Sequence, residues 1–335
     1  MTTIGHTVLQ NHIGRIAGVP FHPILMHFAA RYHGTTYSAF AQNHRVLVDS
    51  NIHCMDDFGF DAVSVISDPY RETAAFGAHV TFPAESVPVC REHIVSTRED
   101  VAALPRPDVH MSPRTRDRID GVALYRTRIG DDVPVIGWVE GPLAEACDLA
   151  GVNEILLQLA LDPDYVRMLM DRCIVTAGDF ALAQIDAGAD IMGVGDAICS
   201  QVSPEMYERF VLPLHRELFA AIHEAGAAVK LHICGNITHL LDLIAQTGAD
   251  IVDIDWMVDM NTAYSALGDG IVRCGNLDPV SVIQDLPEPM LRDRSDTCVA
   301  AETGRPFIFS GGCEVTVNTP HENLAAMTAA AHQAV

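Results

Sequence analysis

The sequence has few basic residues for its length of 335. Lys and Arg together number 21 against 44 Asp and Glu, which gives a formal net charge of −23. A negative field of this size repels the phosphate backbone of nucleic acids. It also keeps a protein soluble in a crowded or salty cytoplasm. We therefore expect no nucleic-acid partner.

Long hydrophobic runs and structured cysteine spacing are also lacking. No stretch reaches the roughly 18 to 20 uncharged apolar residues that a membrane span needs, and MTTIGHTVLQNHIGRIAG at the start has no apolar signal-peptide core. The nine cysteines follow no disulfide framework. We expect a cytoplasmic protein without membrane association, whose cysteines are reduced and mostly small core residues, as we predict for Cys274.

Strand-like runs alternate with helix-like runs along the chain. The eight candidate strands are residues 23–28, 62–67, 133–139, 189–195, 228–233, 249–255, 270–275 and 306–311. This alternation predicts a parallel sheet with right-handed crossovers, and eight units fit a (β/α)8 TIM barrel. An open, doubly wound sheet is the alternative, although neither a Gly-x-Gly-x-x-Gly turn nor a Walker loop is present.

We expect the barrel to form a single domain over residues 1–335. Around it we expect an N-terminal helical extension at about residues 1–20. Residues 83–120, rich in Pro, Arg and Asp, are expected to form an excursion between the second and third units.

Polar residues recur where the predicted strands end. Catalytic groups of such barrels lie at the carboxyl ends of the strands. The residues at these ends are His27 with Arg31, Asp68, Glu140, Asp196, His232 with Cys234, Asp255, Asn276 with Asp278, and Cys313. Simpler roles compete for some of them. An Asp after a strand often caps a helix or closes an Asx turn, which we expect for Asp278 and weigh equally for Asp68. One of Asp253 and Asp255 could simply face solvent.

His232, Cys234 and Cys313 form the most distinctive pattern. Residues i and i+2 of a strand share a face, so His232 and Cys234 can reach one metal ion. Gly235 permits the tight turn that follows, and Cys313 closes a Gly-Gly-Cys turn after another strand. Two thiolates and an imidazole would hold zinc with a fourth position open, which is typical of a catalytic zinc site. We expect a metal-activated small molecule, best a thiol, as substrate.

The order of these motifs resembles the uroporphyrinogen decarboxylase superfamily, and within it the methylcobamide:thiol (coenzyme M-type) methyltransferases. The resemblance covers essentially the whole chain. It is carried by ILMHFAARYHGTTYSAF, DAVSVISDPYRETAAFGA, GPLAEACDLAG, GADIMGVGDAICSQVSPEMYERFVLPLHRELF, KLHICGNITHLLDLIAQTGADIVDID, CGNLDPVSVI and SGGCEVTVNTPHENLAAM. The decarboxylases differ in having a Gly-His-Gly turn at the place of Cys313, no His-x-Cys pair, and an arginine-rich N-terminal signature of which only Arg31 remains here.

The resemblance implies one Zn²⁺ per chain, held by His232, Cys234 and Cys313. It implies methyl transfer from a methylcobamide to a zinc-bound thiol, because zinc displaces the thiol proton and anionic thiolate ligands keep the sulfur nucleophilic. The chain has no corrinoid-binding Asp-x-His-x-x-Gly motif. The methylcobamide is therefore expected on a separate corrinoid protein that docks over the barrel mouth.

The other strand-end residues are expected to serve the substrate. Asp196 and Glu140 are candidate catalytic groups, either as a displaceable fourth ligand or as the acceptor of the thiol proton. The candidate substrate-binding residues are His27, Arg31, Asp68, Asp255 and Asn276. Among these, His27 and Arg31 could hold an anionic tail, unless Arg31 only pairs with Asp68.

Several functions remain open at this point. A related zinc-dependent transferase or lyase acting on another alkyl or sulfur compound would use the same ligands. A zinc-free decarboxylase of a porphyrinogen-like acid and a non-enzymatic metal-binding protein are further alternatives. The acceptor is coenzyme M in archaeal relatives, but homocysteine or another thiol is equally compatible with these residues.

Overall fold

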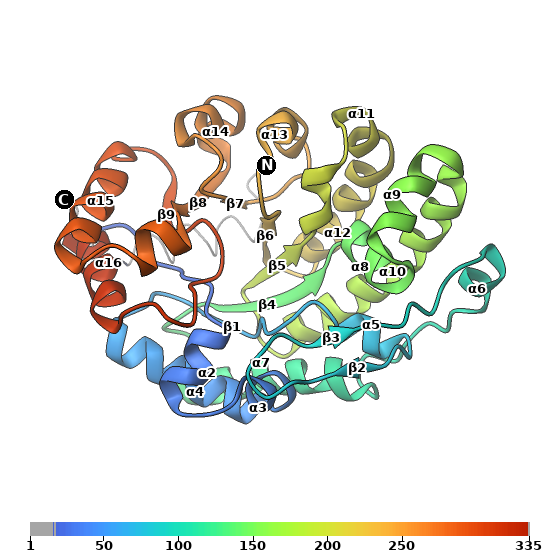
Figure 1. Ribbon diagram of the computed structural model, residues 1–335, viewed down its shortest axis with the longest axis horizontal. Coiled ribbons are helices and arrows are strands. Elements are labelled where there is room, and N and C mark those ends of the chain that lie inside the picture. Colours follow the sequence, from blue (N-terminus) through green and yellow to red (C-terminus); the bar gives the residue numbers. More distant parts are fainter. Residues whose placement is uncertain (1–15, 17, 334–335) are drawn as a thin grey trace.

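A curved parallel sheet surrounded by helices forms the fold (Figure 1). The computed structural model describes residue 16 and residues 18–333. Seven strands pair side by side in chain order, and every neighbouring pair is parallel. They are β1 (Val63–Ser64), β4 (Val135–Glu140), β5 (Ile191–Gly195), β6 (Ala228–His232), β7 (Ile251–Ile254), β8 (Val272–Leu277) and β9 (Phe307–Gly311). The barrel-type prediction is confirmed, and the doubly wound alternative is wrong because the strand order never reverses.

The predicted first strand, residues 23–28, is wrong. Phe21 makes an isolated parallel bridge to Phe309 in β9, and its carbonyl accepts the backbone N–H of Asp61 at 3.1 Å, just before β1. The segment therefore lies between the two edges of the sheet, where an eighth strand would stand. Pro23 has no N–H to donate, so the pairing is not continued and a helix follows.

The helices follow from ordinary start and stop signals. Those that cover the sheet are α2 (His27–His33), α3 (Tyr37–Gln42), α4 (His44–Phe58), α5 (Arg71–Ala75), α7 (Pro113–Ile129), α8 (Pro142–Ala150), α9 (Val152–Leu161), α10 (Pro163–Asp186), α11 (Pro204–Met206), α12 (Leu212–Glu224), α13 (Leu241–Ile244), α14 (Met260–Leu267), α15 (Glu288–Ala301) and α16 (His321–Gln333). The apolar run at 154–188 is two helices, because Asp162 caps α10 by accepting the N–H of Tyr165 and Pro163 occupies its first turn. Among the described residues, no helix is long and apolar enough to cross a membrane.

The expected excursion has its own secondary structure. An antiparallel pair, β2 (Val80–Thr81) and β3 (Val89–Cys90), is followed by α6 (Arg98–Ala103). The end of the predicted segment, from Pro113, is already the crossover helix α7 that leads into β4. The expected N-terminal helical extension lies almost wholly outside the described residues.

The core has two layers, one on each face of the curved sheet. The larger packs the outer face of the strands against the helices. The smaller lies inside the barrel and consists of Ile24, Ala62, Ile66, Ile136, Trp138, Ile191, Ala228, Ile251, Val272, Cys274 and Ile308. These residues share one parity along each strand, so the alternate side chains of the strands fill the barrel. Cys274 is buried, as predicted.

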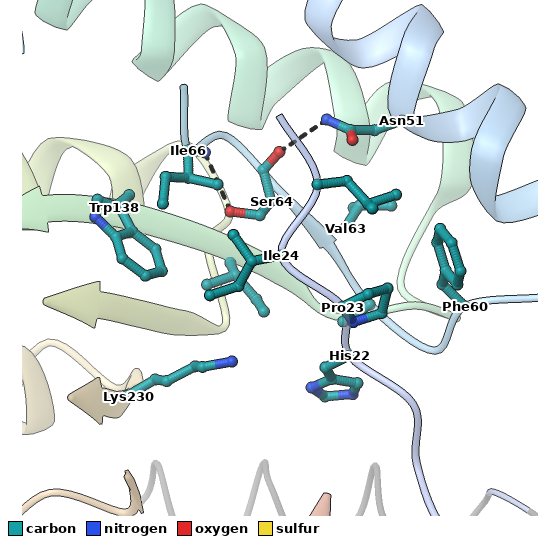
Figure 2. Close-up of a pocket in the computed structure, with 13 residues that line it drawn as sticks. His22, Pro23, Ile24, Asn51, Phe60, Val63, Ser64, Ile66, Trp138 and Lys230 are labelled. Atoms are coloured by element: carbon teal, nitrogen blue, oxygen red, sulfur yellow. Dashed lines mark hydrogen bonds between the residues drawn. The ribbon is translucent and has the colours of Figure 1, made fainter. Parts of the chain in front are cut away.

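A small cavity remains within the barrel (Figure 2). Its volume of about 20 Å³ is sufficient for one water molecule. Most of its lining is apolar, including Ile24, Ile136 and Trp138, but Lys230 and His22 also border it. The barrel therefore has polar side chains beneath its mouth.

Candidate metal centre

The structure brings the three predicted ligands together at the carboxyl end of the sheet. His232 Nε2 lies 3.0 Å from Cys234 Sγ, and Cys234 Sγ lies 3.6 Å from Cys313 Sγ. All three ligand atoms lie within 4.8 Å of one another. A tetrahedral ion with bonds of about 2.0 to 2.3 Å requires ligand atoms roughly this far apart, so the residues present fit a zinc ion.

Two glycine turns allow this convergence. Gly235, directly after Cys234, has φ = +91°, a conformation that glycine adopts without strain. Gly312, directly before Cys313, packs against the loop after β7, where a Cβ atom would lie 2.3 Å from the backbone nitrogen of Trp256. The turns at β6 and β9 therefore place both sulfurs beside the end of β7.

A buried carboxylate orients the imidazole. Asp253 Oδ2 lies 2.8 Å from His232 Nδ1, and its Oδ1 lies 3.0 Å from Lys230 Nζ. The hydrogen bond to Nδ1 leaves Nε2 as the nitrogen that faces the two sulfurs. Carboxylate–histidine pairs of this kind accompany most histidines that bind metals. Neither of Asp253 and Asp255 faces solvent, since both are 5% exposed.

The pKa values of the three candidate ligands are shifted in different directions. The hydrogen bond from Cys234 lowers the pKa of the Cys313 thiol to about 4, although burial opposes this. The same hydrogen bond and burial raise the pKa of Cys234. Burial opposes a charge on His232, but the neighbouring Cys234 and the bond to Asp253 raise its pKa well above the usual range. At neutral pH these directions favour a thiolate at Cys313, a thiol at Cys234 and an imidazolium at His232, and a metal ion that binds all three would then displace two protons.

Asp196, an expected catalytic residue, belongs to a different group. Its carboxylate accepts the N–H of Ala144 at 2.7 Å, at the start of α8, and lies 2.9 Å from His215 Nε2. Both Asp196 and His215 are 0% exposed. The clustering of side chains places Asp196 with Cys199 and His215, apart from the three predicted ligands. Asp196 therefore connects β5, α8 and α12 through buried hydrogen bonds.

Glu140, the second expected catalytic residue, lies at the level of the ligands. It pairs in register with Gly195, which pairs in turn with His232. Gly195 has no side chain, and a Cβ atom there would lie 3.2 Å from the indole nitrogen of Trp138 and 3.3 Å from Glu140 Oε2. Glu140 Oε1 accepts a 2.6 Å hydrogen bond from Arg71, but burial raises the pKa of the carboxyl well above its usual range.

The expected substrate-binding residues divide into two groups. Asp255 accepts the N–H of Gly235 at 2.9 Å, and the amide of Asn276 donates to the carbonyl of Val258 at 2.9 Å. Asp255 therefore holds the turn after Cys234, and Asn276 holds the loop after β7. Asp278, the remaining strand-end residue, caps the turn after β8 through the N–H groups at 280 and 281, as predicted.

The other group lies toward α2. His27 stacks on Tyr37 with ring centroids 4.9 Å apart. Arg31 is exposed and donates to Asn318 at 3.0 Å. The expectation that Arg31 could pair with Asp68 is wrong, because Asp68 is buried against Arg114.

Sequence reasoning missed three residues of the site. The strand pattern could have identified Asp253 and Lys230 as facing into the barrel. Each lies two residues before another inward-facing residue of its predicted strand, Asp255 and His232 respectively. Glu314 follows Cys313, accepts the N–H of His27 at 3.1 Å, and has its pKa raised to about 7 by burial. No spacing rule singles out Glu314.

Comparison with known proteins establishes the family. The uroporphyrinogen decarboxylase (URO-D) family model matches residues 15–334, and the chain belongs to this family. It is 29% identical over 272 residues to a methylcobamide:CoM methyltransferase, MtbA, of Methanosarcina mazei, covering 80% of this chain and 78% of the relative. It is 32% identical over 292 residues to a uroporphyrinogen decarboxylase of Syntrophotalea carbinolica, covering 83% and 81%.

A solved structure supports the same fold. A methyltransferase from Methanosarcina mazei superposes with a TM-score of 0.87 at 20% sequence identity, and the match covers 98% of both chains. Overall identity is similar for the two kinds of relative. The side chains at the barrel mouth must therefore decide between their activities.

Proposed function

We propose that the protein is a zinc-dependent methyltransferase that moves a methyl group from a methylcobamide, carried by a separate corrinoid protein, to a thiol. The observation that carries this proposal is the cluster of His232 Nε2, Cys234 Sγ and Cys313 Sγ within 4.8 Å. Three protein ligands leave a tetrahedral position for substrate. When bound, zinc supplies the Lewis acidity that holds an acceptor thiol as its thiolate at neutral pH.

The chain's own residues prepare the centre for a thiol. The sulfur of Cys313 already favours the thiolate, because Cys234 and His232 donate to it. Two anionic sulfurs then offset the charge of the ion, so that the bound acceptor remains nucleophilic. Asp253 holds the imidazole by Nδ1 at 2.8 Å. Together these contacts fix the direction from which the acceptor approaches, which is the positional part of catalysis.

The acceptor's place is the space beside Gly195, between Glu140 and His232. We propose Glu140, held in its ionised form by the pair with Arg71, as the group that receives the thiol proton, since burial favours the protonated form of its carboxyl. Anionic groups of the acceptor would meet Arg31, the exposed cation on α2. The hydrogen-bonding role found for Asp196 argues for support of the fold rather than for chemistry.

The corrinoid protein must approach the same mouth. Trp256 and Met257, on the loop directly after β7, are 45% and 49% exposed. They adjoin the Gly312 turn that presents Cys313. Large exposed apolar side chains beside a site are typical of contact surfaces. We propose that this loop contacts the corrin or its carrier protein.

Metal analysis of protein purified without added zinc tests the first step. We expect close to one zinc per chain, lost in Cys313→Ala and His232→Ala but retained in Cys90→Ser, whose cysteine lies in β3 and outside the cluster. Metal-free wild-type protein with an intact fold would overturn the proposal.

An absorbance assay tests the reaction. We expect thiol-dependent conversion of methylcobalamin to cob(I)alamin, with coenzyme M and homocysteine among the thiols compared. A protein that binds zinc but converts none of the thiols would instead support another zinc-dependent alkyl or sulfur transferase. Metal-free protein that releases carbon dioxide from a porphyrinogen acid would support the decarboxylase relatives.

A further inference from the structure

Lys230 is the only lysine in the sequence, and it lies inside the barrel. Its side chain is 2% exposed and extends into the cavity beneath the mouth (Figure 2). Burying an ammonium group is costly unless a counter-charge compensates for it. An apolar side chain would fill the same position without that cost, as Trp138 and Ile136 do nearby. Core packing alone therefore does not account for a lysine at this position.

One carboxylate connects Lys230 to the ligand set. Asp253 Oδ1 lies 3.0 Å from Lys230 Nζ, and Asp253 Oδ2 lies 2.8 Å from His232 Nδ1. Lys230 Nζ also lies 3.6 Å from Cys274 Sγ. Because Lys230 and His232 are two residues apart on β6, both point into the barrel, one layer above the other. Asp253 on β7 spans the two layers.

We propose that Lys230 is a positioning residue for the metal centre, whose ammonium group holds Asp253 in the orientation that directs His232 Nε2 toward the metal. This inference rests on the proposed function. It adds a charge balance to that function. Before the acceptor thiolate binds, two cysteine thiolates, the Asp253 carboxylate, a Zn²⁺ ion and the Lys230 ammonium have formal charges of −2, −1, +2 and +1, which sum to zero. Without the lysine, the loaded centre would hold an uncompensated negative charge in a poorly solvated interior.

The chain's single lysine provides a direct probe. Protein labelled with ¹³C and ¹⁵N in lysine, without a lysine-containing tag, has one lysine side chain to observe by NMR. Zinc is titrated into metal-stripped wild-type protein, and the Lys230 Cε and Nζ signals are followed. We expect them to shift in proportion to zinc and to stop at one equivalent. The shift should be absent in Cys313→Ala, which lacks a ligand.

A substitution tests the consequence. In Lys230→Met, which keeps the length but loses the charge, we expect zinc affinity to fall by about 10- to 100-fold, the usual effect of losing a partner behind a metal ligand. The d–d absorption of the cobalt-substituted protein should shift as well. Arg273→Met is the matched control, because Arg273 is also fully buried and paired, at 2.6 Å with Glu302. It should lower stability and leave zinc affinity unchanged.

The outcomes separate this inference from the proposed function. Wild-type protein that binds no zinc would overturn both. Zinc binding that leaves the Lys230 signals unmoved, or a folded Lys230→Met with wild-type affinity, would overturn only the role of Lys230. An equal loss of zinc affinity in Arg273→Met would show that the loss in Lys230→Met comes from general instability, and it would also overturn the inference. If Lys230→Met does not fold, the wild-type titration still decides.

Discussion

Proton release on zinc binding is the sharpest test of the candidate centre. The structure predicts that the free cluster at neutral pH holds Cys313 as thiolate, Cys234 as thiol and His232 as imidazolium. A metal ion binds sulfur as thiolate and imidazole in its neutral form. Zinc binding should therefore release two protons at pH 7, one from Cys234 and one from His232.

The pH dependence separates this cluster from three independent ligands. With ordinary pKa values of about 8.5 for each cysteine and about 6.5 for histidine, binding would release about three protons at pH 5 and only about half a proton at pH 9. In the cluster, the thiolate at Cys313 is already formed at pH 5, so about two protons should leave. At pH 9 the raised pKa of Cys234 still requires the loss of at least about one proton.

Isothermal titration calorimetry in pairs of buffers with different ionisation enthalpies measures this number directly. The apparent affinity for zinc should rise about 100-fold per pH unit wherever two protons are released. Three protons at pH 5 together with fewer than one at pH 9 would refute the shared-proton cluster, because the three ligands would then titrate as if isolated. In Cys90→Ser, whose cysteine lies outside the cluster, the numbers should equal those of the wild type.

Three further predictions follow from packing and charge. Gly193→Ala places a Cβ 2.2 Å from the ring of Trp138, so we expect the free energy of unfolding, measured in urea, to fall by about 1 to 3 kcal/mol. Zinc binding should weaken as well, because the Trp138 ring packs edge-on to His232. Burial raises the pKa of Asp148 to about 7, above the roughly 3.9 of an unfolded chain, so the free energy of unfolding should fall as pH rises from about 4 to about 7. In Asp148→Asn the free energy of unfolding should depend less on pH, and at pH 8 it should exceed that of the wild type by about 1 to 2 kcal/mol. Urea unfolding at pH 5 and pH 8 measures both values. An unchanged pH dependence of the free energy of unfolding would contradict this prediction. Trp256→Ala should keep its zinc, raise the KM for methylcobalamin several-fold and reduce the quenching of tryptophan fluorescence by cobalamin to the part that comes from Trp138. Unaltered quenching would show that the exposed ring lies away from the corrin.

The barrel and the convergence of His232, Cys234 and Cys313 could be predicted from the sequence because both depend on local regularities. Strand and helix periodicity is repeated along the chain, and the spacing of His232 and Cys234 follows from the pleat of a single strand. Cys313 joined them through the assumption that strand ends meet at one edge of the sheet together with the family resemblance. The first strand was mispredicted because apolar composition outweighed Pro23, which removes a hydrogen-bond donor needed for pairing.

The partners of the strand-end acids could not be predicted in this way. Asp196 and Asp255 look alike in the sequence, since each directly follows a buried strand. In the fold, Asp196 meets the start of α8 and His215, whereas Asp255 holds the turn after Cys234. The difference arises from helices that lie far away in sequence, so strand position indicates where an acid lies but not what it contacts.

On the inner face of the sheet, polar side chains lie toward the carboxyl ends of the strands and apolar side chains lie below them. At the lowest level Ala228 pairs in register with Ile191, and both are apolar. The next level pairs Lys230 with Ile251, and the level at the mouth pairs His232 with Asp253. Each step upward is a shift of two residues along the same strands, so a relative can keep the barrel while exchanging one level. Such an exchange is compatible with the similar overall identities of the methyltransferase and decarboxylase relatives, 29% and 32%. If depth sets function in this way, substitutions of Lys230 and Asp253 should lower zinc affinity, and apolar substitutions of Ala228 or Ile191 should alter stability at constant zinc affinity.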